Sequence, residues 1–210
     1  MEGTYRALCA HGYASLTMQD IADECGKSTS LLHYHFDTKE ELLVSFIEYI
    51  LDDFEETVVA SDADDPARRL VELVAWFVLI PEDQDRQSFH SALLELRSQA
   101  PFDERYREQL IKSDDLLRET FADVLADGVE MDVFEPVDVD RTAALLVATL
   151  DGARTRQLTL GDPEYTRAVA EATLRRIVDP ILAPGESLPP LASALDAGAD
   201  RTRSDGDSIE

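Results

Sequence analysis

The chain has 210 residues, of which 44% are hydrophobic and 30% are charged, and its formal net charge is −25. This length is enough for one sizeable core, or for a small head and a larger body. No stretch approaches the roughly 18 consecutive apolar residues of a membrane span, and the opening MEGTYRALCAHG lacks a secretory signal. We therefore expect a cytoplasmic protein without a membrane partner.

The first predicted helix covers residues 2–12, and Gly12 and Tyr13 end it. Its packed side carries residues at helical spacing, namely Tyr5, Leu8, Cys9 and Gly12. Tyr13 is expected to fill the small core of the head. We interpret Cys9 and Cys25 as buried small hydrophobic residues, with a redox switch as the alternative.

Residues 17–36 predict two short helices joined by a tight turn. Thr17 and Asp20 have the spacing of a helix cap, and Gly26 ends the first helix because glycine tolerates left-handed backbone. Ser28 can cap the second helix by accepting a hydrogen bond from a free amide. Two short helices joined by a short turn are typical of a helix-turn-helix. The side chains expected on the buried sides are Met18, Ile21, Ala22, Cys25, Leu32 and Phe36.

The rest of the sequence predicts longer helices. Thr38 and Glu41 form a capping box that opens a fourth helix to about residue 60. Further helices are expected at 66–80, 83–99, 103–126, 140–160 and 165–182, with Gly128 ending the third of these five. The expected fold is therefore all-α, with about nine helices. The expected domains are a DNA-reading head at 1–54, a helical body at 55–183 and a disordered acidic tail at 184–210.

The last two predicted helices are apolar on more than one side. Such a helix needs a partner beyond the core of its own subunit, and small residues allow close packing. We therefore expect a homodimer, with the interior of a monomer as the alternative. The residues assigned to the dimer face are Ala144, Val147, Ala148, Gly152, Val169, Ala172, Thr173 and Arg176.

The stretch GYASLTMQDIADECGKSTSLLHYHFDTKEELL resembles the TetR family of transcriptional regulators. The matching residues stand at the spacing of the family pattern: Gly12, Tyr13, Thr17, Ile21, Ala22, Gly26, Ser28, Phe36, Lys39, Glu40 and Leu42. The chain departs from that pattern at Lys27, Thr29, Ser30 and His33. These departures fall on outward positions, so they bear on the operator sequence rather than on the fold.

The resemblance implies a double-stranded DNA operator as partner. Thr17 and Lys39 match the residues that hold phosphates in the family, and Tyr34 and His35 match an aromatic pair that touches the backbone and sometimes bases. The residues expected in the major groove are Lys27, Ser28, Thr29, Ser30 and His33. Three alternatives remain open: Ser28 is only a cap, His35 packs inside the head, and Lys27 is simply solvated.

Charge argues against DNA binding at first sight. Residues 1–43 contain three Lys or Arg and seven Asp or Glu, a balance of 3 − 7 = −4, whereas DNA-binding heads are normally basic. Either the head does not bind DNA, or the protein works in a cytoplasm so salty that charges are screened within about 3 Å at 1 M. Aspartate is spread over every segment and lysine occurs only at Lys27, Lys39 and Lys112, a bias that resembles halophilic proteins.

The family body holds a small-molecule cavity, so the resemblance implies a repressor released from a palindromic operator by a small hydrophobic or aromatic effector. Bulky residues on the surrounding helices are candidates for its lining, although each could be plain core: Trp76, Phe77, Phe89, His90, Leu93, Tyr106 and Phe121. The alternative function is a protein-interaction module of the same fold that lost operator binding. No sequence arrangement indicates an enzyme, a cofactor or a metal site.

Overall fold

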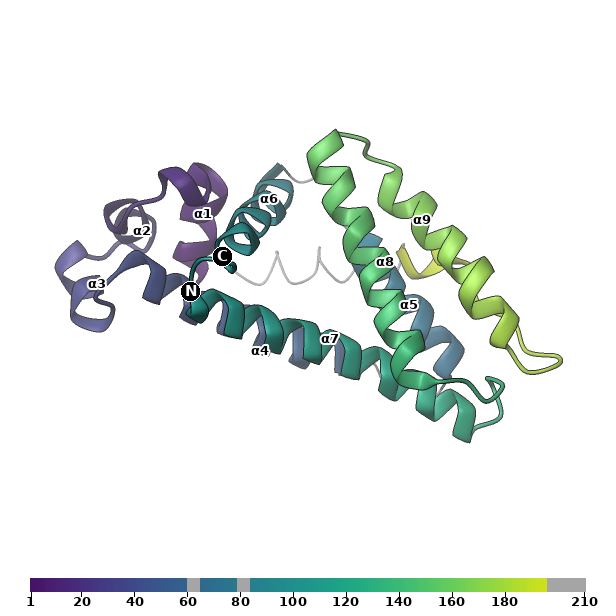
Figure 1. Cartoon of the computed structure of the whole chain (residues 1–210). Helices are drawn as coiled ribbons and strands as arrows, with labels where there is room; N and C mark the ends of the chain where they lie inside the picture. The colour runs from purple at the N-terminus through teal and green to yellow at the C-terminus, as the bar shows by residue number, and fades with distance from the viewer. Residues whose placement is uncertain (60–64, 79–83, 196–210) are drawn as a thin grey trace. The chain divides into compact units, whose positions relative to one another are not determined.

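A computed structural model describes residues 1–59, 65–78 and 84–195, with only the backbone for 50–59 and 84–89. The expected all-α class is confirmed over this part of the chain, where helices are joined by loops and one isolated bridge links Phe134 to Leu182. Figure 1 shows the elements. They are α1 (Glu2–Ser15), α2 (Met18–Glu24), α3 (Thr29–His35), α4 (Lys39–Val59), α5 (Pro66–Val78), α6 (Gln84–Gln99), α7 (Glu104–Glu130), α8 (Val139–Leu160), α9 (Tyr165–Thr173), a π-helical turn η1 (Leu174–Val178) and a 3-10 turn η2 (Asp179–Ile181).

Two glycines affect the helices in ways that differ from each other. Gly12 interrupts α1 with a φ of 67° and a ψ of 163°, and the helix then resumes to Ser15 instead of ending. Gly128, expected to end α7, lies inside this helix. Its missing side chain makes room for Phe134, since a Cβ on Gly128 would stand 2.1 Å from the Phe134 ring. A tertiary contact therefore explains a glycine that looks like a helix stop.

The C-terminal region also differs from the sequence prediction. The last predicted helix, 165–182, divides into α9, η1 and η2. Residues 184–195 of the expected disordered tail are described, and residues 191–195 form a helical turn in which Leu191 is buried. Residues 196–210 lie outside the described part of the chain.

The chain divides into two compact units. Unit 1 comprises Met1–Val59 and Pro81–Asp114, and unit 2 comprises Ala60–Ile80 and Asp115–Glu210. The sequence predicts a boundary near residue 54, which would put α6 and the start of α7 in the second domain. They pack in unit 1 instead, because Ala92, Leu96 and Tyr106 are buried in its hydrophobic cluster.

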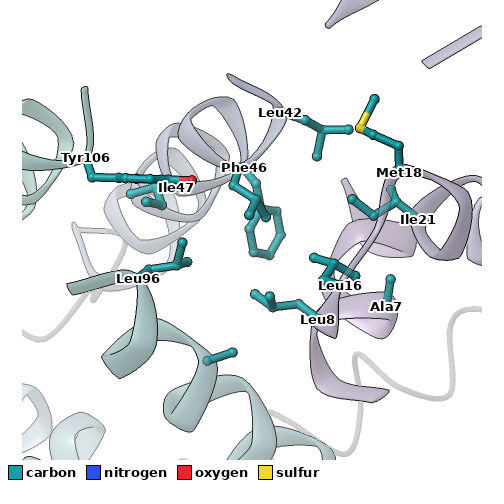
Figure 2. Close-up of a cluster of buried hydrophobic side chains, with 12 residues drawn as sticks. Ala7, Leu8, Leu16, Met18, Ile21, Leu42, Phe46, Ile47, Leu96 and Tyr106 are labelled. Atoms are coloured by element: carbon teal, nitrogen blue, oxygen red, sulfur yellow. The ribbon is translucent and has the colours of Figure 1, made fainter. Parts of the chain in front are cut away.

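The hydrophobic cluster of unit 1, called here the unit 1 core, joins α1, α2, α4, α6 and α7 (Figure 2). On α1 the buried side is turned by about one residue from the expected one, so that Thr4 and Ala7 are buried while Tyr5 and Cys9 are only half-buried. The core residues are Ala7, Leu8, Leu16, Met18, Ile21, Leu42, Leu43, Phe46, Ile47, Ala92, Leu96 and Tyr106.

Unit 2 is built around α5, which packs against α8 and α9 (Figure 1). Asp65 caps α5, because its Oδ1 accepts a hydrogen bond of 3.0 Å from the Ala67 amide. Arg69 of α5 also pairs with Asp127 of α7 at 2.6 Å. Gly161 ends α8 in the left-handed conformation, with a φ of 71°. These contacts fix the ends of α5 and α8.

Candidate nucleic-acid interface

The first helix of the predicted helix-turn-helix, α2, opens with a complete capping box. The Thr17 amide donates to Asp20 Oδ2 at 2.8 Å, and the Asp20 amide donates back to Thr17 Oγ1 at 3.2 Å. The Thr17 hydroxyl also donates to Asp20 Oδ2, at 2.6 Å. These bonds from Thr17 stabilise the carboxylate and lower the pKa of Asp20. The proton of the Thr17 hydroxyl is thus directed at Asp20.

The turn between α2 and α3 is closed by backbone hydrogen bonds. Gly26 has a φ of 60°, a conformation that glycine adopts without steric cost. The Lys27 amide donates to the Ala22 carbonyl at 2.9 Å and the Gly26 amide donates to the Asp23 carbonyl at 3.1 Å, the pair of bonds that defines a Schellman motif. Arg6 of α1 adds a bond of 2.7 Å to the carbonyl of Glu24.

The second helix, α3, begins at the expected cap, where Ser28 Oγ accepts from the Leu31 amide at 3.2 Å. Leu32 and Phe36 are partly buried against the unit 1 core. The opposite side is open to solvent, with Tyr34 83% exposed and its ring packed edge-on against His35. His35 is exposed too, so it does not pack inside the head. The predicted base-reading residues Ser28, Ser30 and His33 share this exposure with Lys27.

Thr29 behaves differently from its neighbours on α3. It is half-buried, and its hydroxyl donates to Oε1 of Gln19 on α2. Gln19 in turn donates from Nε2 to Asp23 Oδ1 at 2.7 Å. Gln19 is not among the residues predicted for the interface, although its spacing of four residues from Asp23 on a helix is a recognisable signal. Thr29 thus belongs to a polar chain that ties the two helices together.

Lys39, the predicted phosphate contact at the start of α4, is held by the end of α1. Its Nζ donates to the Tyr13 carbonyl at 3.1 Å and lies 4.7 Å from the centre of the Tyr13 ring. The predicted capping box of α4 is shifted by one residue. Thr38 Oγ1 accepts from the Glu41 amide as expected, but Glu41 Oε2 accepts from the Asp37 amide, at 2.8 Å.

The candidate effector residues do not form one group. In unit 2 the Phe77 ring lies 6.1 Å from the Phe121 ring and 5.2 Å from the Trp76 ring. In unit 1, Tyr106 is in the core, Leu93 packs against that core, and His90 is half-buried on α6. The Phe89 side chain lies outside the described residues. An open hollow of about 520 Å³ in unit 2 is lined by none of the seven, but by Ala172, Arg175, Arg176 and Asp179.

An arginine packs against two of these aromatic rings. The Arg154 guanidinium of α8 lies 4.7 Å from the centre of the Phe77 ring and 5.1 Å from that of Trp76. Its Nη2 donates to the Phe77 carbonyl at 2.9 Å, near the C-terminal end of α5, where the helix dipole favours a cation. The group thus joins α5 to α8.

The candidate dimer residues also differ in their exposure to solvent. Val147 and Thr173 are each only 4% exposed, so they pack within their own subunit. On α8, Ala148 and Gly152 are exposed and share a stripe with Leu145, which is 52% exposed. Arg176 is exposed on η1, whereas the remaining candidates are half-buried, namely Ala144, Val169 and Ala172.

Two family models match the chain. Residues 1–46 match a model described as bacterial regulatory proteins, tetR family, and residues 66–183 match one described as BetI-type transcriptional repressor, C-terminal. The chain belongs to the TetR family of transcriptional regulators. TetR regulators bind DNA through the helix-turn-helix that the first model covers. The relatives found are named as transcriptional regulators and not as enzymes.

Individual proteins are similar to this chain over different parts of their length. A TetR regulator from Haloarcula marismortui is 38% identical, with a TM-score of 0.78 over 86% of this chain and 95% of its own. BetI of Agrobacterium fabrum is 31% identical over 53% of this chain, and the match spans 54%, about half, of BetI. A Saccharomonospora viridis regulator in complex with choline, 24% identical, has a TM-score of 0.71 over 83% of this chain and 93% of its own, and shows the fold alone.

The described residues lack membrane-spanning helices and clusters of metal ligands. Among the helices within 1–59, 65–78 and 84–195, none is long and apolar enough to cross a membrane. Over the same part of the chain, His, Cys, Asp and Glu side chains do not gather in threes as metal ligands would.

Proposed function

We propose that the protein is a dimeric repressor that binds a palindromic operator and releases it when a small ligand binds. The observation that carries this proposal is the outer side of α3. Ser30, His33, Tyr34 and His35 are all exposed there, while Leu32 and Phe36 hold the helix on the unit 1 core. Such a helix can enter the major groove with its polar side chains against base edges.

Phosphate contacts would orient this helix, and Lys39 is the stronger of the two candidates. An ammonium group has three donors, and the bond to the Tyr13 carbonyl uses one of them. The Thr17 hydroxyl would first have to turn its proton away from Asp20. We therefore assign the main phosphate contact to Lys39, and Thr17 a smaller one.

A twofold dimer would place two heads on successive turns of one face of the duplex. The stripe of Leu145, Ala148 and Gly152 on α8 supports this arrangement, since an exposed apolar stripe on a long helix favours a second helix against it. Val147 and Thr173 are left out of the proposed interface because they are buried in their own subunit.

Ligand release requires that the effector binds the released state better than the DNA-bound state. The BetI-type model over residues 66–183 and the choline complex of the Saccharomonospora viridis protein support a ligand site in the body. We propose Trp76, Phe77 and Phe121 as its lining in this chain. Tyr106 and Leu93 contribute to the unit 1 core instead.

The acidic head favours a second candidate, a protein-interaction module without an operator. Of the three basic residues in 1–43, Arg6 is already paired with Glu24 at 3.2 Å, which leaves little positive charge for DNA. A repressor with so acidic a head would have to work in a cytoplasm of high salt concentration, where long-range charge repulsion is screened. Counterion release then contributes little, and hydrogen bonds and shape determine affinity.

Selection of bound fragments from random DNA, followed by gel shifts at KCl concentrations up to molar, separates the two functions. The repressor predicts an enriched palindrome that is still shifted at high salt. A complete lack of sequence-specific binding at every salt concentration would remove the repressor and leave the interaction module.

A further inference from the structure

The position of Lys39 depends on a residue outside the helix-turn-helix. Lys39 is half-buried, and Tyr13 restrains its ammonium group both through the backbone carbonyl, at 3.1 Å, and through the ring face, at 4.7 Å. A lysine side chain loses considerable rotamer freedom when it is fixed on a ligand. Contacts that fix it beforehand reduce this cost, as in any pre-organised site.

The Tyr13 ring is in turn fixed by Tyr106. The two rings meet edge to face, with centres 6.3 Å apart and planes at 84°. Tyr106 is only 1% exposed and is part of the unit 1 core on α7, shown in Figure 2. Tyr13 itself is only partly buried at the edge of this core, so it depends on its neighbours for a fixed orientation.

The contact made by Tyr106 is one of ring packing. Its hydroxyl is buried and has no hydrogen-bond partner within 3.5 Å among the described residues, and burial, with a smaller contribution from the nearby Tyr13 hydroxyl, raises the pKa of Tyr106. A buried hydroxyl without a partner is unfavourable compared with an apolar group of the same shape. The ring is therefore the part of Tyr106 that contributes to the contact, and phenylalanine should replace it.

We propose that Tyr106 is a positioning residue for DNA binding, which holds the Tyr13 ring in the orientation that presents Lys39 to a DNA phosphate. This rests on the proposed function, since it requires Lys39 to bind phosphate. The residue belongs to α7, so the phosphate contact depends on a helix outside the helix-turn-helix.

The first test needs no DNA. The chain contains only three lysines, Lys27, Lys39 and Lys112, so the side-chain spectrum of protein labelled with ¹³C-lysine is simple. Protons above an aromatic ring are shifted upfield by the ring current. One lysine should show this shift and lose its signal in Lys39→Met. The shift should persist in Tyr106→Phe and disappear in Tyr106→Leu; persistence in Tyr106→Leu would overturn the proposal.

The second test measures DNA affinity of the full chain for the selected operator. Tyr106→Leu should weaken binding roughly 3- to 10-fold, the range expected for losing an aromatic pair. It should also lower the dependence of log K on log salt by up to about 0.9, the contribution of one phosphate contact. Tyr106→Phe should match the wild type. In a Lys39→Met background, Tyr106→Leu should have no further effect.

Leu96→Ala is the matched control, because Leu96 is equally buried in the unit 1 core but lies on α6. The fold-losses in affinity from Leu96→Ala and Lys39→Met should multiply in the double variant, because the two residues act independently.

If the fold-losses from Tyr106→Leu and Lys39→Met also multiply, the positioning role is wrong and the repressor function stands. If Lys39→Met leaves affinity and salt dependence unchanged, the phosphate assignment fails together with the positioning role. Loss of the proposed function itself would appear as a wild-type protein that binds no DNA.

Discussion

The backbone of Gly3 on α1 lies against Cys25 at the end of α2, so that a Cβ atom added to Gly3 would stand 2.4 Å from the Cys25 sulfur and 3.0 Å from its Cα. The clash involves backbone, so a rotation of the thiol cannot relieve it. We expect Gly3→Ala to reduce the free energy of unfolding by ~1–3 kcal/mol, the usual cost of overpacking, as measured by urea denaturation.

Ala10 provides the control for this substitution, because it lies on the same helix but is exposed. Ala10→Ser also adds one heavy atom, but at a position open to solvent, so it should change the free energy of unfolding by no more than about 0.5 kcal/mol. Equal effects of the two substitutions would show that the contact between Gly3 and Cys25 is not close.

The capping box of α2 predicts a pH-dependent contribution to stability. The Thr17 hydrogen bonds lower the pKa of Asp20, so the folded state binds its proton less tightly than the unfolded chain. The contribution is therefore present above the ordinary carboxyl pKa of 3.8 and is lost as pH falls through the lowered value. Asp20→Asn should be less stable than the wild type at neutral pH, and the difference should shrink in acid. Thr17→Ser, which keeps the hydroxyl, should retain the wild-type pH profile of the urea midpoint.

DNA contacts should separate into two kinds of effect. Lys39→Ala is expected to weaken binding to all sequences alike, because a phosphate contact carries no base information. His33→Ala should instead change base preference at one position of each half-site, by ~1–3 kcal/mol if the contact is a good one. Repeating the selection from random DNA with each variant measures the base preference, and gel shifts measure the affinity. An unchanged affinity of Lys39→Ala would contradict the phosphate assignment.

Thr29 and Gln19 should act as one unit. Since the Thr29 hydroxyl donates to Gln19, Thr29→Val and Gln19→Ala both break the same link between α2 and α3. Each should alter operator affinity, and the double variant should lose little more than either single one. Additive losses in the same binding assay would mean that the two side chains contact DNA separately.

The dimer face can be tested without disturbing the subunit. Gly152→Trp introduces a large side chain at an exposed position, where a Cβ meets no atom of its own chain within 4 Å. We expect it to shift the protein to monomers in sedimentation velocity and to abolish binding to a full palindrome. Glu119→Trp, at an exposed position of α7, is the control and should remain dimeric. A dimeric Gly152→Trp would place the interface elsewhere.

Short-range chemistry explains why the helix-turn-helix could be predicted. The caps at Thr17 and Ser28 and the turn at Gly26 depend on residues within a few positions of one another, and the expected hydrogen bonds are present. The outward side of α3 followed from the helical period alone. Thr29 is the exception, because its orientation is set by Gln19, ten residues earlier on another helix.

Long-range packing explains what could not be predicted. Periodicity identifies the apolar side of α6 but not the element it meets, so the burial of Leu96 in the unit 1 core is visible only in the structure. The same is true of Tyr106, which the sequence suggests as an effector contact. Gly128 lies inside a helix, and Phe134 from the following loop packs in the space left by its missing side chain. At each of these three positions, a contact with a different helix or loop determines where the residue lies.

Glu95 of α6 accepts a hydrogen bond of 3.2 Å from the amide of Ala14, just after the break in α1 at Gly12. Together with Leu96 and Tyr106, it makes the DNA-reading helices depend on residues about ninety positions further along the chain. A fragment that stops at residue 59 would therefore expose one whole side of α1 to water. Swapping operator specificity between relatives by grafting their first sixty residues would require that α6 and the beginning of α7 be transplanted as well.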